Sequence, residues 1–421
     1  MNTLRRIVGN TENEGLPIGA VGRSYNLHIT PVEELVTRKE RLQRLLQDKG
    51  IDGAIILQRA DLFYFSGTGQ DGHLLIPASG ESVLLARKSF DRARRESRLP
   101  VVEKFPRSKE LPGTIRLNFR QIQKIGMELD VVPANHYLRF RAMFPETEIV
   151  DVSPLIRQIR MIKSEYEIGK LHEAAAMSDR LFAKVPEFLE LGINEFTFAG
   201  RLEGYYRSLG HQGFVRVRSF NQEVFYGHVM SGANLAAPSY PDSATGGSGL
   251  NPSFPQGAGR KLLGPNEPIM VDFAGVHDGY MADQTRIFVF GQLAERLVEA
   301  FETALRIEQY LRENATPGAR CSELFAATQD LAAQAGFGDH YMGYREKARF
   351  VGHGIGIELD EWPVIGHGID TRLEERMVVA IEPKFLFPDI GVVGLENTCV
   401  VRSRGLEALT KFPNEITYLK R

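Results

Sequence analysis

The stretch IMVDFAGVHDGYMADQTRIFVFG, residues 269–291, decides the fold of the larger part of the chain. Two apolar segments flank a His-Asp-Gly turn, which predicts a β-hairpin. If the two-residue turn is His277-Asp278, then Asp272 and Asp283 lie directly opposite each other, with Cβ atoms about 5 Å apart. A turn centred one residue later would break that pairing. Two carboxylates at this distance share a proton, find a basic partner or bind a cation, whereas two ordinary solvated aspartates are the plain alternative.

A second segment, FVGHGIGIELDEWP at residues 350–363, places His353 among glycines. Glycines allow close backbone approach and remove side chains that would block a ligand from the imidazole. A structural histidine in a glycine-rich loop is the alternative for His353 taken alone.

Two glutamates follow within apolar, strand-like runs. Glu382 lies in MVVAIEP, residues 377–383, and Glu396 in GVVGLENTCVV, residues 391–401. Buried charged groups need a partner or a metal, although exposure on an edge strand would explain either one alone. Together, four carboxylates and one imidazole suit two divalent ions such as Mn, Fe, Co or Zn with an activated water between them. The pattern therefore favours a dinuclear hydrolase.

The amino-acid composition limits the classes of molecule that the protein is expected to bind. The 421 residues are 43% hydrophobic and 25% charged, with a net charge of −2 and two cysteines. No strong field would attract nucleic acid or anionic lipid, and no run has the length of a membrane span or signal peptide. We expect a cytoplasmic enzyme acting on a peptide or small molecule, without nucleic-acid or membrane partners.

The order of segments predicts an α/β (α+β) protein of two domains. Residues 1–25 are polar and glycine-rich, which is typical of a flexible arm. Alternating helices and strands fill residues 26–155, and Ser164 with Glu167 forms a capping box that opens a long helix near the start of a second domain, 156–421. The glycine-rich segment 243–260 is either a loop at the site or a flexible flap.

These segments, in this order, resemble the creatinase, aminopeptidase P, prolidase and methionine aminopeptidase family of "pita-bread" metallohydrolases. The resemblance covers almost the whole chain. Besides the hairpin and the two glutamates, it rests on R-x-x-K-S-E-x-E-I at 160–168, SGAN at 231–234, TPG at 316–318 and GHGIG at 352–356. It implies a creatinase-like N-terminal domain, a pseudo-twofold catalytic domain and a homodimer.

The resemblance also implies roles for single residues. Asp272 and Asp283 would bind metal from one hairpin, and His353 with Glu382 would complete the shell of the second ion. Asp283 and Glu396 would bridge both ions, and Glu382 would accept a proton from the attacking water.

Three positions depart from the family pattern. Ser239 and Asp360 stand where the peptidases usually have histidines that contact the scissile amide, and Gly394 stands where many have arginine. Loss of those histidines removes donors for the developing oxyanion. Asp360 offers instead a base or a partner for a cationic substrate, or it is a solvated loop residue.

Three more residues are candidates for the site. His228 would supply an imidazole from another direction, unless it is structural. Lys384, where relatives commonly have glycine, either neutralises an acidic site or covers a surface. Trp362, the only tryptophan, walls the substrate pocket or packs in the core.

Three functions compete. The leading one is a manganese-type metallopeptidase, an Xaa-Pro aminopeptidase or dipeptidase. The alternative is a non-peptidase member of the fold, a metal-dependent lyase or C–N hydrolase, which the changes at Ser239 and Asp360 favour. A binding module without catalysis is the third, and retention of all five predicted metal ligands argues against it.

Overall fold

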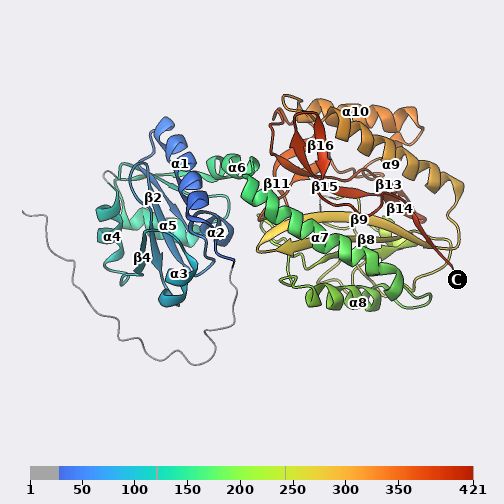
Figure 1. Ribbon diagram of the computed structural model, residues 1–421, viewed down its shortest axis with the longest axis horizontal. Coiled ribbons are helices and arrows are strands. Elements are labelled where there is room, and N and C mark those ends of the chain that lie inside the picture. The colour runs from blue at the N-terminus through green and yellow to red at the C-terminus, as the bar shows by residue number, and fades with distance from the viewer. Residues whose placement is uncertain (1–27, 120–121, 242, 421) are drawn as a thin grey trace, which may run out of the picture.

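The chain folds into two α/β domains, seen side by side in Figure 1. The computed structural model describes residues 28–119, 122–241 and 243–420. The predicted arm at 1–25 lies outside the described residues. The predicted domain boundary near residue 155 falls within helix α6 (Ser153–Met161), which joins the two domains.

The N-terminal domain is built on a mixed sheet of six strands among the described residues, in the order β4-β3-β2-β1-β5-β6. Apolar residues spaced three to four apart bury one face of α1 against it, with Leu35, Leu42 and Leu46 at most 1% exposed. Its elements are α1 (Val32–Asp48), β1 (Gly53–Ile56), α2 (Arg59–Ser66), β2 (Gly72–Pro77), β3 (Val83–Ala86), α3 (Phe90–Glu96), β4 (Val101–Lys104), α4 (Leu111–Asn118), β5 (Lys124–Met127), α5 (Ala134–Met143) and β6 (Glu148–Asp151).

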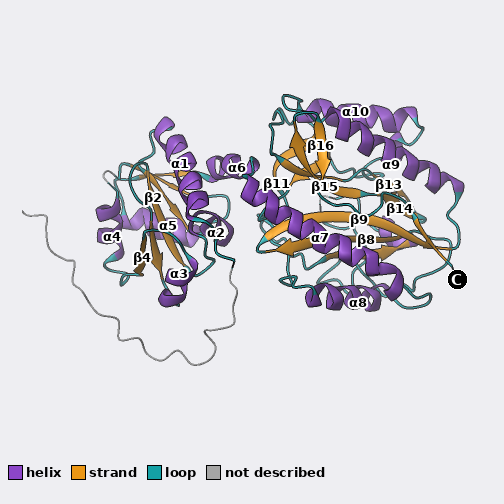
Figure 2. Cartoon of the chain, in the orientation of Figure 1, coloured by secondary structure: helices purple, strands orange, loops and turns teal. Residues whose placement is uncertain are grey.

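The C-terminal domain is a strongly curved sheet between two layers of helices (Figure 2). The predicted capping box is present, since the Ser164 hydroxyl accepts the Glu167 amide while the Glu167 carboxylate accepts the Ser164 amide. The helices are α7 (Glu165–Phe188), α8 (Glu195–Ser208), α9 (Glu295–Asn314) and α10 (Cys321–Gln334). Helices α7 and α8 pack on one face and α9 and α10 on the other.

The main sheet runs β11-β10-β12-β15-β9-β8-β7, and β16 and β17 pair with β15 and β9. A separate hairpin, β13–β14, lies beside it. The strands are β7 (Gly227–Ser231), β8 (Ile269–His277), β9 (Tyr280–Phe290), β10 (Phe350–Gly354), β11 (Glu361–Gly366), β12 (Val378–Ile381), β13 (Lys384–Phe387), β14 (Gly391–Gly394), β15 (Glu396–Arg402), β16 (Gly405–Ala408) and β17 (Thr417–Leu419).

Of the two turns considered for the β8–β9 hairpin, the structure has the one that is centred one residue later. The turn residues are Asp278 and Gly279, with φ of 48° and 85°. A type I′ turn needs positive φ at both positions and favours Asp-Gly, and this preference decides the register. Asp272 therefore pairs with Thr285 rather than with Asp283. The two aspartates are diagonal neighbours on one face of the sheet, still within side-chain reach.

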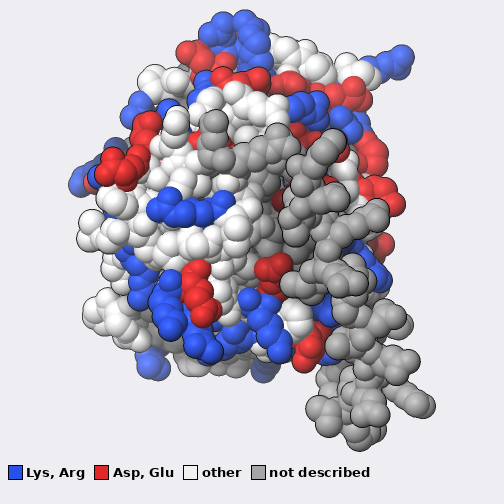
Figure 3. Space-filling view, turned by 90° about the vertical axis from the view of Figure 1, so that its left-hand side faces the viewer, with Lys and Arg blue, Asp and Glu red and all other residues white. Residues whose placement is uncertain are grey.

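One of the hydrophobic clusters spans both domains. Leu42 and Ile56 of the N-terminal domain belong to the same buried cluster as Val276 and Ile355 of the C-terminal domain. At the outer end of the N-terminal domain, where its surface is described, acidic and basic side chains are interspersed (Figure 3). No helix among the described residues combines the length and the apolar character needed to cross a membrane.

Candidate active site

Five residues predicted to bind metal come together at one cavity of about 130 Å³ in the C-terminal domain. Strands β8, β9, β10 and β15 supply four of them, and the fifth, Glu382, directly follows β12. The five are Asp272, Asp283, His353, Glu382 and Glu396, and all five line this cavity. Sequence segments more than a hundred residues apart are thus joined by one sheet.

A lysine lies among these carboxylates. Lys384 is 1% exposed, and its Nζ lies 2.7 Å from Glu382 Oε2 and 3.1 Å from Asp272 Oδ2. Glu396 Oε2 is 3.5 Å from the same Nζ and also accepts the Thr285 hydroxyl at 2.8 Å. Of the two alternatives for Lys384, the structure shows the first, because the ammonium neutralises an acidic site.

His353 presents one ring nitrogen to the cluster. Its Nδ1 lies 3.1 Å from the carbonyl oxygen of Leu359, while Nε2 lies 3.7 Å from Glu396 Oε1 and 3.9 Å from Glu382 Oε1. Burial alone would lower the pKa of His353, but the Glu396, Asp360 and Glu382 carboxylates raise it well above its usual value, so Nε2 carries a proton in the metal-free site. With Nδ1 held by a carbonyl, Nε2 is the nitrogen that would bind a metal once that proton is lost.

The carboxylates differ in their proton affinity because each has different neighbours. Burial raises the pKa of Asp283 well above its usual value, and the Glu396 charge adds to this. Burial also raises the pKa of Glu382, to about 7, although the Lys384 ammonium opposes the change. Burial acts in the same direction on Glu396, but Lys384 and His353 outweigh it and lower the pKa to about 2.

The predicted catalytic residues His228 and Asp360 line the same cavity. His228 faces Asp272 across the β7–β8 pairing, and burial lowers its pKa, so that its imidazole is neutral. Asp360 is the more accessible group: its side chain is 50% exposed, and Oδ1 lies 3.6 Å from His353 Nδ1. The two flank the carboxylate cluster.

Ser239 and Trp362, predicted to contact substrate, are not among the described residues lining this cavity. The Ser239 hydroxyl donates to the Pro255 carbonyl beside a neighbouring cavity that shares Tyr240 with the first. The Trp362 ring stacks against the Arg157 guanidinium, 4.4 Å from its centroid. Substrate contact by either residue stays a prediction.

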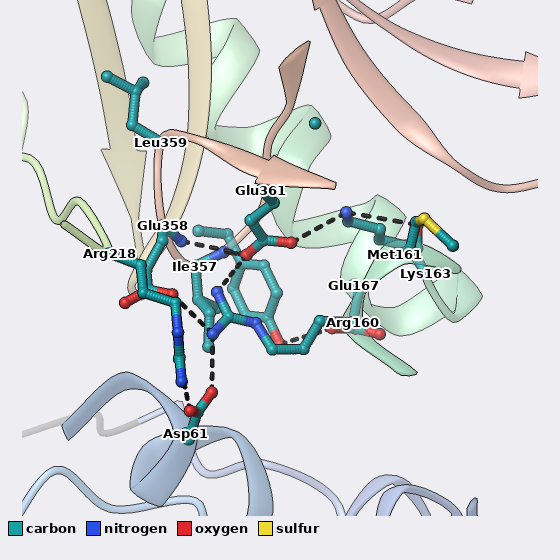
Figure 4. A network of polar contacts seen from close by, with 12 residues as sticks. Asp61, Arg160, Met161, Lys163, Glu167, Arg218, Ile357, Glu358, Leu359 and Glu361 are labelled. Atoms are coloured by element: carbon teal, nitrogen blue, oxygen red, sulfur yellow. Dashed lines mark hydrogen bonds and ion pairs between the residues drawn. The ribbon is translucent and has the colours of Figure 1, made fainter. Parts of the chain in front are cut away.

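A buried ion network supports the loop that carries Asp360 (Figure 4). Glu361 accepts Arg160 at 2.5 Å and Lys163 at 3.1 Å, which explains two residues of the 160–168 motif. The other Arg160 nitrogen contacts Glu358 and Asp61, each at 2.7 Å. Asp61 belongs to the N-terminal domain, and its sequence context carried no signal of this role. Arg218, also missed from sequence, holds Asp61 at 2.5 Å.

The fold and the carboxylate–imidazole cluster together define a metallohydrolase of the two-domain, pita-bread class. Residues 169–403 match Metallopeptidase family M24, and residues 38–162 match the Creatinase/Prolidase N-terminal domain. The chain belongs to metallopeptidase family M24 and is an enzyme. This confirms the predicted family and fold class, and the family implies divalent metal cofactors and a peptide substrate.

Similar proteins extend over nearly the whole chain. It is 28% identical to an uncharacterized peptidase of Bacillus subtilis and 25% identical to the Xaa-Pro dipeptidase of Pyrococcus furiosus, each over 90% of this chain and 99% of the relative. Among solved structures, the Xaa-Pro dipeptidase from Bacillus anthracis superposes with a TM-score of 0.79 at 25% identity, covering 91% of this chain and all of the other.

Proposed function

We propose that this enzyme hydrolyses the amide bond of a small Xaa-Pro dipeptide with the help of a divalent cation. The observation that carries the proposal is a group of four carboxylates and one imidazole around one small cavity, of which all but Asp272 are buried. Carboxylate oxygens and imidazole nitrogen suit ions such as Mn or Co. The similarity to Xaa-Pro dipeptidases supports the choice of substrate.

The ligand atoms fit a cation. Asp283, His353 and Glu396 each offer one atom, and these atoms lie within 4.8 Å of one another. All three residues are buried, where uncompensated carboxylates are costly. When bound, the ion would polarise the scissile carbonyl and lower the pKa of water.

Glu382 is the group that would take the proton of the attacking water. Its pKa of about 7 allows it to accept a proton and later release it at neutral pH. Because Lys384 holds Oε2 at 2.7 Å, the accepting atom would be Oε1. The neutral His228 imidazole faces the same cavity and would position the substrate by a hydrogen bond.

The glycine-rich segment 243–260 forms part of the wall. Ser243 and Gln256 line the cavity, and the Gln256 amide donates to the Glu223 carbonyl at 3.0 Å. This contact ties the segment to Glu223, which also lines the cavity. In our proposal the segment bounds the space for the substrate and thereby limits the length of peptide that the pocket accepts.

A second candidate is a C–N hydrolase or lyase that acts on a small cationic molecule. The half-exposed Asp360 favours it, because a carboxylate stands at the pocket where the peptidases usually have a histidine. That carboxylate would pair with a positive group of the substrate or serve as a base.

A panel of substrates distinguishes the two candidates. We expect turnover of Xaa-Pro dipeptides in added Mn(II), little turnover of matched dipeptides without proline, and loss of activity with a chelator. Bound metal without turnover of any dipeptide would refute the peptidase and favour the second candidate.

A further inference from the structure

The ammonium group of Lys384 lies where three of the predicted metal ligands converge. Asp272, Glu382 and Glu396 each turn one oxygen toward its Nζ, at 3.1, 2.7 and 3.5 Å. The lysine side chain is 1% exposed, so bulk water does not screen this charge. The cluster thus already contains one cation that belongs to the chain itself.

A metal ion and this ammonium cannot use the same three oxygens. Metal–carboxylate bonds are about 2.0–2.2 Å long. An ion bonded to all three oxygens would therefore lie at the position of Nζ, and two positive charges in contact repel strongly at a buried site. Asp272 consequently has its inward oxygen committed to the lysine.

The other atoms of the cluster remain available to an ion. Glu396 divides its oxygens, with Oε2 toward Lys384 and Oε1 toward His353 Nε2. Together with Asp283, these two residues provide the group of ligand atoms within 4.8 Å of one another. One ion fits there without displacing the lysine.

The β13–β14 hairpin places a glycine directly beside the lysine. Lys384 pairs with Gly394, and a Cβ added at Gly394 would lie 2.4 Å from the Pro383 carbonyl oxygen, 2.8 Å from Lys384 Cα and 2.9 Å from Lys384 Cγ. A side chain at 394 would thus meet the backbone of the strand that carries the lysine. The position that departs from the family pattern by losing its side chain is the direct neighbour of Lys384 in this hairpin.

We propose that the active site binds one divalent ion, on Asp283, His353 and Glu396, and that the Lys384 ammonium takes the place of a second ion. The inference rests on the proposed metal-assisted function and replaces the predicted pair of ions. It makes Asp272 a partner of the lysine instead of a metal ligand. Of the two cations in the cluster, the Lys384 ammonium would then be permanent and insensitive to chelators, and only the metal ion could be removed.

Metal stoichiometry of the full chain tests this proposal without measuring activity. After dialysis with Mn(II) and removal of free ion, elemental analysis should give one Mn per wild-type chain. Asp272→Asn and Asp283→Asn form a matched pair on one hairpin: the first should keep one Mn, with an affinity within about threefold of wild type, and the second should lose it. Lys384→Gly should bind two. Lys163→Met, at another buried lysine, should bind one.

Circular dichroism shows which variants fold. If Lys384→Gly does not fold, the comparison of Asp272→Asn with Asp283→Asn still tests the proposed single-ion site. Two Mn per wild-type chain, loss of Mn in Asp272→Asn, or one Mn in folded Lys384→Gly would each overturn this inference while leaving the proposed hydrolase intact. Absence of Mn from the wild type would overturn the proposed function as well.

Discussion

Replacing Glu361 by glutamine removes one negative charge from the buried network without changing its shape. Glu361 is 6% exposed, and its carboxylate holds both Arg160 and Lys163. Burial alone would raise its pKa, yet these two cations lower it from 4.5 to about 2. At 1.36 kcal/mol per pKa unit, the charged form stabilises the fold by about 3 kcal/mol. Loss of one partner of a buried ion pair typically costs about 3–5 kcal/mol.

The pH dependence follows from the direction of this shift. A carboxyl group with a lowered pKa in the folded state stabilises the fold fully above its unfolded pKa, and this stability disappears as the pH falls through the folded pKa. The difference between wild type and Glu361→Gln should therefore be about 3 kcal/mol at pH 7 and should shrink between pH 4.5 and about 2.

Urea unfolding followed by tryptophan fluorescence measures the difference in the free energy of unfolding between wild type and Glu361→Gln, with a probe next to the substituted residue. Trp362 is the only tryptophan and adjoins Glu361 in sequence. The matched control is Glu407→Gln, in a pair with Arg402 on the surface, which should change the free energy of unfolding by at most about 1 kcal/mol. Equal effects of the two substitutions at pH 7, or a Glu361→Gln effect that does not change with pH, would refute the reasoning.

Three more substitutions test the site. Asp283→Ala should abolish both metal binding and turnover, measured by elemental analysis and dipeptide hydrolysis, and an active variant with bound metal would exclude the site. Asp360→Asn should lower turnover about 100-fold with unchanged metal content; unchanged kinetics would make Asp360 an ordinary loop residue. Gly356→Ala should destabilise the chain by about 2 kcal/mol in urea unfolding, since its Cβ would lie 2.6 Å from Glu361 Oε1. A variant as stable as wild type would show that the loop adapts freely.

Sequence periodicity predicted much of the fold correctly because helix and strand signals are local. The capping box at Ser164 and the helix that follows it are examples. The five residues predicted to bind metal came from separate sequence segments and the family resemblance, and the sheet gathers all five at one cavity, whereas metal binding by them stays a prediction. The sequence left the hairpin register open between two turns, and the preference of type I′ turns for Asp-Gly decides it in favour of Asp278-Gly279.

Contacts between distant segments carried no local signal. The direction of the Lys384 side chain depends on carboxylates at Asp272, Glu382 and Glu396, so the sequence left two alternatives for it. Asp61 looks like an ordinary first-turn aspartate of a short helix. Only the packing of the two domains brings it to Arg160, 99 residues away.

The bridge from Asp61 to Arg160 and Arg218 also restricts how this protein can evolve. The N-terminal domain contributes no described residue to the cavity lining, so its surface would be expected to drift freely. Yet a recombination event that exchanged this domain with a relative lacking Asp61 would leave two buried arginines short of a counter-charge. The two domains are therefore expected to be inherited together, as one unit of selection, even though only one of them performs the chemistry.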